Sequence, residues 1–327
     1  MQITKAFYTV ILILVISLLC TACSAQEELT TTATTAPATA EQSTTEEETA
    51  AAPTETTAAP VETTTEETTT DAAAAVTAIT WDSGWEYADY SVIHTDSATL
   101  YRSQSADRRG KVICVNAGHG TKGGSSVRTQ CHPDGSAKVT GGSTAKGSVT
   151  ATAISEGTTL LNGTTEADAN LSLALLLKDK LLESGFDVLM VRESKDAQLD
   201  NIARTVIANN NADCHIALHY DSSESDKGLF YLAVPDVKSY RAMEPVQSHW
   251  QQHEALGEAL VDGARTQDVK IFSNGRMEID LTQTSYSTIP SVDLEVGDRA
   301  SDCDAATQGR IADGIVEGLK RYFSQEQ

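Results

Sequence analysis

The sequence predicts an α/β fold with a mostly parallel central sheet that is flanked by helices on both faces. From Lys111 onward, short apolar runs alternate with segments whose apolar residues recur at helical spacing. This alternation is typical of parallel sheets, because the crossover between parallel strands usually passes through a helix that covers one face. Three of the apolar runs carry or lead into polar side chains that can bind metal or transfer protons. Functional groups gather at the carboxyl ends of the strands in such sheets, so the pattern also indicates where a site would lie.

The individual elements follow from the length and spacing of the apolar runs. Short runs are predicted as strands, at residues 111–115, 187–191, 214–219, 229–234 and 291–296. Longer segments with apolar residues three and four apart are predicted as helices, at residues 166–184, 199–209, 253–266 and 305–323. Thr165, with Asp168 three residues later, is predicted to cap the first helix, and Gly185 is expected to end it.

The first residues resemble a bacterial export signal with a lipidation site. One basic residue, Lys5, precedes an apolar run from Ala6 to Leu19, and small residues then lead to Cys23. The run is shorter than the roughly 20 apolar residues that a membrane-spanning helix needs. We therefore expect a signal peptide over residues 1–22, lipidation of Cys23, and an extracytoplasmic protein anchored to the membrane and facing the cell wall. The alternative is ordinary secretory cleavage a few residues away, which also places the protein outside the cytoplasm.

The next segment, residues 23–78, is expected to be a disordered tether. Between residues 24 and 75 it consists almost entirely of Thr, Ala, Glu and Pro, with no Lys or Arg and with 11 of the chain's 46 acidic residues. Such a composition buries too little apolar surface to offset the entropy of ordering the chain. The tether accounts for half of the net charge of −22, and an acidic chain without clustered basic residues argues against nucleic-acid binding.

The remaining residues divide into a short aromatic-rich segment and a region long enough for one domain with a core. Residues 79–110 carry no recognisable motif and are either an edge strand or a small appended piece. Residues 111–327 are expected to form the catalytic domain. The cysteines outside the signal region lack the Cys-x-x-Cys spacing of a zinc or redox site, and their pairing is left open: Cys114, Cys131, Cys214 and Cys303.

Four residues at strand ends and at a helix start match the needs of a catalytic zinc site. His119 follows the first predicted strand, His219 ends the third, Glu295 lies in the last, and Glu166 opens a helix. Such a site uses three protein ligands and leaves one position for a water that the metal acidifies. His119, Glu166 and His219 are the candidate ligands, and Glu295 is the candidate carboxylate for proton transfer. Each residue alone also fits a structural role, such as a core histidine or a charge at a helix start, and the combination favours the site.

Four motifs in order carry a resemblance to a known family. They are residues 112–120 (VICVNAGHG), 162–171 (NGTTEADANL), the stretch 204–219, and 289–297 (IPSVDLEVG). They resemble the zinc-dependent N-acetylmuramoyl-L-alanine amidases of the amidase-3 group and cover most of residues 111–323. The resemblance implies a zinc hydrolase/phosphorylase-like fold, hydrolysis of the amide between N-acetylmuramic acid and L-alanine in peptidoglycan, and Zn²⁺ as the cofactor. It also implies that His119, Glu166 and His219 bind the zinc and that Glu295 is the catalytic acid–base.

The sequence departs from this family at several positions. Asn116 stands where the family usually has Asp, and the change would weaken the support of a ligand histidine if this residue contacts one. Arg204 is expected to be structural, pairing with a carboxylate. Residues 121–162, rich in Gly, Ser, Thr and Lys, are expected to form either a flexible lid or a wall of the substrate site. Among the other histidines, His215 is expected to fill the core, with a place one layer below the site as the alternative. His132 is expected in the loop, with an approach to the metal as the alternative, and His249 and His253 are expected at the surface or along the substrate groove.

Two other functions share parts of this pattern. A zinc carboxypeptidase acting on peptide stems would use similar chemistry, but its ligands commonly come from one short motif, whereas His119 and Glu166 are far apart. A catalytically inactive wall-binding module would share the fold; Asn116 keeps this alternative open, and the presence of Glu295 with three candidate ligands favours the enzyme. Peptidoglycan, and the membrane through the lipid anchor, are the expected partners, and the sequence identifies no activating protein partner.

Overall fold

The computed structural model describes residues 75–325. The predicted signal peptide, the lipidation site at Cys23 and nearly all of the predicted tether lie outside this range. Among the described residues, no helix combines the length and the apolar character that crossing a bilayer requires.

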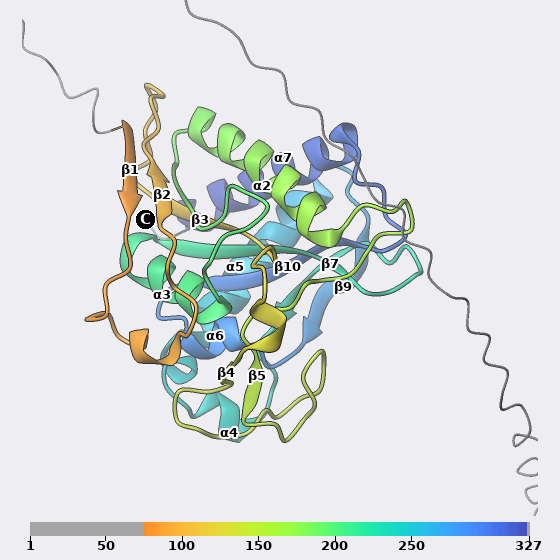
Figure 1. Ribbon diagram of the computed structural model, residues 1–327. Helices are drawn as coiled ribbons and strands as arrows, with labels where there is room; N and C mark the ends of the chain where they lie inside the picture. The colour runs from red at the N-terminus through yellow and green to blue at the C-terminus, as the bar shows by residue number, and fades with distance from the viewer. Residues whose placement is uncertain (1–74, 326–327) are drawn as a thin grey trace, which may run out of the picture. The chain divides into compact units, whose positions relative to one another are not determined.

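Eight strands within residues 75–325 form one sheet in the order β1-β2-β6-β3-β7-β10-β8-β9. In Figure 1, β1 and β2 lie at the left-hand edge of this sheet. The strands are β1 Val76–Ile79, β2 Ala98–Tyr101, β3 Val112–Ala117, β6 Asp187–Met190, β7 Cys214–Asp221, β8 Leu229–Ala233, β9 Ile271–Glu278 and β10 Ser291–Asp298. The central strands β6, β3, β7 and β10 are parallel to one another, and β9 is parallel to β8. β2 and β8 lie antiparallel to their inner neighbours β6 and β10. The predicted α/β fold with a mostly parallel sheet is confirmed.

Helices cover both faces of this sheet. They are α2 Glu166–Glu183, α3 Asn201–Asn211, α4 Lys238–Arg241, α5 Val246–Arg265, α6 Thr282–Tyr286 and α7 Ala305–Ser324. α2, α5 and α7 share one core with Val115 of β3, whereas α3 packs on the opposite face against Cys114. Adjacent residues of one strand thus enter different cores, as the two-residue period of a strand requires.

The structure extends the sheet beyond the predicted strands at both edges. β2, within the aromatic-rich segment, pairs with β6, and aromatic side chains of that segment pack against α3 and Tyr286. β9 was not predicted, because exposed polar residues and Gly275 interrupt its apolar pattern. α5 begins at Val246, whereas the predicted start was residue 253. The prediction was late because the first turns of the helix are mostly polar and lack an apolar pattern. The shorter elements are the 3-10 turns η2 Ala88–Tyr90 and η3 Gly124–Ser126 and the hairpin strands β4 Arg128–Gln130 and β5 Thr150–Thr152.

The predicted cap of α2 is present and can be tested by substitution. The side chain of Thr165 accepts a hydrogen bond from the backbone nitrogen of Asp168 at 3.2 Å. Thr165→Ala should lower the free energy of unfolding by about 1 kcal/mol, because one backbone donor in the first turn loses its partner. Urea denaturation measures this loss. Thr165→Ser keeps the hydroxyl and should recover most of it, and equal losses in the two variants would contradict the capping role.

Candidate metal centre

The fold brings the four predicted site residues to one edge of the sheet. His119 follows β3, Glu166 is the first residue of α2, and His219 and Glu295 lie towards the carboxyl ends of β7 and β10. These strands are adjacent in the order β3-β7-β10, and Glu295 is directly paired with His219. Residues distant in the sequence therefore meet because neighbouring parallel strands end at the same edge.

The ligand atoms of His119, Glu166 and His219 converge on one point. Nε2 of His119 lies 2.7 Å from Oε1 of Glu166, Nδ1 of His219 lies 3.0 Å from the same oxygen, and the two nitrogens are 3.1 Å apart. A tetrahedral zinc ion with ligands at about 2.0–2.1 Å separates them by roughly 3.3 Å, so these atoms are spaced to hold one. Within residues 75–325, this is the group of His, Cys, Asp and Glu side chains whose ligand atoms all lie within 4.8 Å of one another.

The hydrogen bonding of His119 fits a cation at this point. Its Nδ1 lies 2.9 Å from the carbonyl oxygen of Ser155, and because a carbonyl can only accept, Nδ1 carries the proton of the neutral ring. Nε2 lies 2.7 Å from the carboxylate oxygen of Glu166, so either a second proton, shared as a hydrogen bond, or a cation must lie between these two atoms. The residues present therefore fit a bound metal ion.

Two buried arginines hold the turn that presents His119. Arg204 of α3 donates to the carbonyl oxygens of Ala117 at 2.9 Å and His119 at 2.8 Å. Arg192 donates to those of Ala117 at 2.8 Å and Gly118 at 3.0 Å. His119 has a φ of 65°, a left-handed conformation that is unfavourable for a residue other than glycine, and these bonds help to keep it there. Arg204 was expected to pair with a carboxylate; instead it binds backbone carbonyls around the candidate ligand.

Among the described residues, Asn116 makes no hydrogen bond to His119 or His219, the two candidate ligand histidines. Its amide oxygen accepts from Arg204 at 3.0 Å, and its amide nitrogen lies 3.2 Å from Nε2 of His215. His215 is fully buried, as expected for a core histidine. Burial, together with the nearby Arg204 charge, lowers the pKa of His215 to about 3, so the ring is neutral and accepts from the amide. Asn116 therefore joins β3 to α3 through Arg204 and to β7 through His215.

Glu166 is kept ionised by its surroundings. Burial raises its pKa, but hydrogen bonds with His119 and His219 outweigh burial and hold the pKa well below its ordinary value. Its Oε2 accepts from the backbone nitrogen of Thr158 at 2.8 Å, which leaves Oε1 for the two imidazoles. A carboxylate must be ionised to bind a metal, so this environment prepares the residue for that role.

Strand β10 contributes a carboxylate that sequence reasoning missed. Asp293 and Glu295 are two residues apart and therefore face the same side of the sheet. Oδ2 of Asp293 lies 3.6 Å from Nε2 of His219. Oδ1 of Asp293 and Oε2 of Glu295 are buried without a hydrogen-bond partner among the described residues. The sequence could have indicated Asp293, because alternate residues of a strand share a face and Asp293 is two residues before Glu295.

The charges of the site favour a cation. Burial raises the pKa of Glu295 well above its ordinary value, and the neighbouring Asp293 carboxylate raises it further. Burial lowers the pKa of His219, but the carboxylates of Asp293 and Glu166 outweigh burial and raise the pKa to about 10. A bound cation would relieve the repulsion among these three carboxylates.

Comparison with known families decides where the chain belongs. The family model described as N-acetylmuramoyl-L-alanine amidase matches residues 113–321, which include all four predicted site residues. The chain belongs to this family. The fold and the enzyme class predicted from the sequence motifs are those of the matching family.

Solved structures and a curated protein are similar to this amidase. The crystal structure of the N-acetylmuramyl-L-alanine amidase Ami1 from Mycobacterium smegmatis is 16% identical, covers 66% of this chain and 98% of that chain, and superposes with a TM-score of 0.53. The apo form of Ami1 from Mycobacterium abscessus is 18% identical, with coverages of 65% and 99% and a TM-score of 0.51. At these identities the two structures establish a shared fold. The uncharacterized protein YqiI of Bacillus subtilis (strain 168) is 29% identical over 175 residues, which are 50% of this chain and 77% of that protein.

In this amidase the segment 121–162 is bonded to the fold in its middle and towards its end. Its last part supplies the backbone groups that hold two of the candidate ligands. Its earlier part is fixed by Asp280, whose carboxylate accepts a bond from the backbone nitrogen of Val139 at 2.6 Å and pairs with Lys138 and His132. His132 belongs to this buried cluster and does not approach the candidate metal centre. Of the two expected roles, these contacts favour a wall over a flexible lid.

His253 of this amidase differs from its prediction. It was expected at the surface or along the substrate site, but it is 2% exposed, and its Nδ1 accepts from the backbone nitrogen of Ser291 at 3.0 Å. Burial lowers its pKa to about 3, so the ring is neutral and joins α5 to the start of β10. His249 lies one turn earlier, and its Nδ1 is 2.9 Å from the carbonyl oxygen of Pro245.

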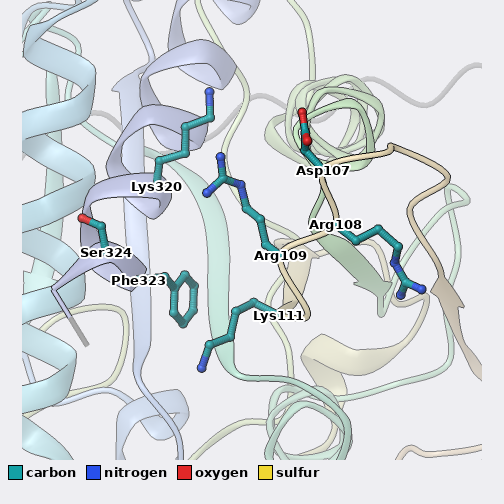
Figure 2. Close-up of a pocket in the computed structure, with 7 residues that line it drawn as sticks. All are labelled: Asp107, Arg108, Arg109, Lys111, Lys320, Phe323 and Ser324. Atoms are coloured by element: carbon teal, nitrogen blue, oxygen red, sulfur yellow. The ribbon is translucent and has the colours of Figure 1, made fainter. Parts of the chain in front are cut away.

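A cavity of about 450 Å³ lies at the opposite end of β3 (Figure 2). It is lined by Asp107, Arg108, Arg109, Lys111, Lys320, Phe323 and Ser324. Lys111 precedes β3 and His119 follows it, so the length of the strand, about 20 Å, separates the cavity from the candidate metal centre. Arg108 pairs with Asp187 at 2.8 Å and Lys111 with Asp213 at 3.3 Å, so acidic residues offset much of the positive charge. The cavity is therefore too far from the candidate metal centre to take part in its chemistry.

Proposed function

We propose that this amidase is a peptidoglycan hydrolase that uses zinc to cleave the amide between N-acetylmuramic acid and L-alanine. The convergence of His119, Glu166 and His219 within the matched family region carries the proposal. These three residues would hold the ion. Zinc in such a site acidifies a bound water and polarises the scissile carbonyl.

Glu295 would be the acid–base group of the reaction. It lies across from His219 on the neighbouring strand, and burial raises its pKa towards the range in which a carboxyl group can both accept and donate a proton. It would take a proton from the attacking water and pass it to the nitrogen of the leaving L-alanine. The products are a free lactyl carboxyl group on the sugar and a free amine on the peptide, so one water is consumed for each bond cleaved.

Digestion of purified peptidoglycan by the full-length protein tests this function. We expect new L-alanine amines and free muramic lactyl groups among the products. New ends within the peptide stems would instead identify a carboxypeptidase. Retained wall binding without any released ends would identify an inactive binding module.

Gly157 offers a sharp test of the site geometry, with Gly163 as its matched control. Gly157 has a φ of +82°, and a Cβ at this position would lie 2.6 Å from Cδ2 of His119 and 2.8 Å from Oε2 of Glu166. Gly163 has a φ of +88° with nothing within 4 Å. Both alanine variants should lose about 1–2 kcal/mol of stability from backbone strain. Gly157→Ala should in addition weaken zinc binding on the order of tenfold or more, because both ligands must shift.

Zinc titration of the two glycine variants measures this difference. Equal zinc affinity in Gly157→Ala and Gly163→Ala would contradict the assignment of His119 and Glu166 as ligands. A loss of affinity in both variants would point to general destabilisation instead.

We also propose that this amidase is attached to the outer side of the cytoplasmic membrane by a lipid on Cys23. A peptidoglycan amidase acts outside the cytoplasm, and the apolar run with small residues before Cys23 supports the anchor. Expression with labelled palmitate should mark the wild type and leave Cys23→Ala unlabelled and released from the membrane fraction. Labelling that survives this substitution would overturn the assignment.

A further inference from the structure

The two ring nitrogens of His219 face different partners. Nδ1 lies 3.0 Å from Oε1 of Glu166 and 3.1 Å from Nε2 of His119, at the point where the ligand atoms converge. Nε2 is turned towards β10 and lies 3.6 Å from Oδ2 of Asp293. If Nδ1 binds an ion, Nε2 must carry the proton of the neutral ring, so the only acidic hydrogen of the imidazole is directed at a carboxylate.

The packing around Asp293 provides no structural reason for a carboxylate. Its neighbours Val292 and Leu294 are buried in the core, and across the sheet Asp293 pairs with Ala217 of β7 and Leu232 of β8. Its side chain is 13% exposed, and Oδ1 has no hydrogen-bond partner among the described residues. A charge in such surroundings is costly unless it is paired, so an apolar side chain would suit the fold better.

We propose that Asp293 is a positioning residue that holds the Nε2 proton of His219, so that the Nδ1 lone pair points at the metal. This inference rests on the proposed zinc site. The other imidazole is held in the same way, because Nδ1 of His119 donates to the Ser155 carbonyl. A carboxylate in this position fixes the tautomer and makes the ligand nitrogen more basic, which strengthens metal binding. The present separation exceeds an ordinary hydrogen bond, and we expect it to shorten when the ion is bound.

The strand register separates the role of Asp293 from that of Glu295. Glu295 is paired with His219 itself, whereas Asp293 is paired with Ala217, two residues further from the carboxyl end of β7. Asp293 therefore lies below the imidazole, towards the middle of the sheet, and Glu295 lies level with it. Asp293 is placed to act through His219, and Glu295 is placed to act on the reacting groups.

Zinc affinity of the full-length protein tests this role, measured by competition with a chromophoric chelator. Asp293→Leu removes the acceptor and keeps a similar volume, and it should weaken zinc binding about 10- to 100-fold. Asp293→Asn retains an oxygen that can accept from Nε2, so its affinity should lie between those of Asp293→Leu and the wild type. The visible spectrum of the cobalt-loaded protein should change in Asp293→Leu and be largely restored in Asp293→Asn.

Asp298→Asn is the matched control on the same strand. The Asp298 carboxylate is buried and accepts from the backbone nitrogens of Lys227 and Ala300, away from His219. This variant should lower the melting temperature and leave zinc affinity within about twofold of the wild type.

The possible results separate this inference from the proposed function. Wild-type zinc affinity in Asp293→Leu overturns the inference, with or without loss of hydrolysis; if hydrolysis alone is lost, Asp293 is a catalytic group. A lower melting temperature of the metal-free Asp293→Leu protein with unchanged affinity also overturns it, in favour of a structural role. A wild type that binds no zinc overturns the proposed zinc site itself.

Discussion

Glu295→Gln is expected to lower the rate of peptidoglycan hydrolysis by about 10²–10⁴-fold while the zinc content stays the same. The amide has nearly the shape of the carboxyl group but cannot take a proton from the attacking water. Glu295 is not one of the three converging ligands, so the ion should remain bound. Zinc analysis and product release from purified walls, measured on the same preparation, test both parts.

Comparison with other variants identifies the cause of that loss. Glu295→Asp keeps the carboxyl group on a shorter side chain and should recover part of the rate. If Glu295→Gln digests walls at the wild-type rate, Glu295 is not the acid–base group. If it loses its zinc together with its activity, Glu295 contributes to metal binding and the division of roles among the four residues is wrong.

Glu295→Gln should also change how the stability of the metal-free protein depends on pH. The pKa of Glu295 is raised above 4.5, so the folded protein binds this proton more tightly than the unfolded chain does. The stability that comes from binding this proton is therefore fully present below pH 4.5, the ordinary pKa of a glutamate, and is lost as the pH rises through the raised pKa of Glu295. Metal-free Glu295→Gln should melt above the metal-free wild type at pH 8 and close to it at pH 4. A difference that does not vary with pH would contradict the raised pKa.

Removal of one proposed ligand should abolish zinc binding as well as hydrolysis, unlike removal of the proposed proton-transfer group. His219→Ala is expected to lose bound zinc and to lower hydrolysis by at least about 10³-fold, because the activated water and the polarised carbonyl are lost together. Chelation of the wild type should have the same result, and added zinc should restore the activity of the wild type alone. Zinc at 1,000 times its dissociation constant should also stabilise the wild type by about 4 kcal/mol.

His249→Ala is the matched control for this substitution. His249 lies on α5, bonded to the Pro245 carbonyl, and takes no part in the candidate metal centre. The control should keep wild-type zinc content and hydrolysis. Full activity of a chelated, zinc-free wild type would refute metal-dependent hydrolysis, and full zinc content in His219→Ala would remove that residue from the ligand set.

Local pattern was enough to predict the central elements of the fold. β7 contains the apolar residues Ile216, Ala217 and Leu218 just before His219, and α2 is preceded by its own capping threonine, so both can be recognised without knowledge of their neighbours. β9 lacked such a signal, because its place at the edge depends on pairing with β8 rather than on apolar side chains. The start of α5 was also missed, since its first turns are mostly polar, and Val246 and Trp250 pack there against residues outside the helix such as Tyr240.

The sequence by itself determined the type of chemistry. The residue types at the ends of apolar runs, together with motifs in a fixed order, indicate His119, Glu166, His219 and Glu295, because side-chain chemistry and strand period are local properties. The tertiary structure decided what surrounds these residues. Strand register placed Asp293 beside His219, since the partner of a residue on a neighbouring strand depends on how separate segments align and not on the pattern within either one.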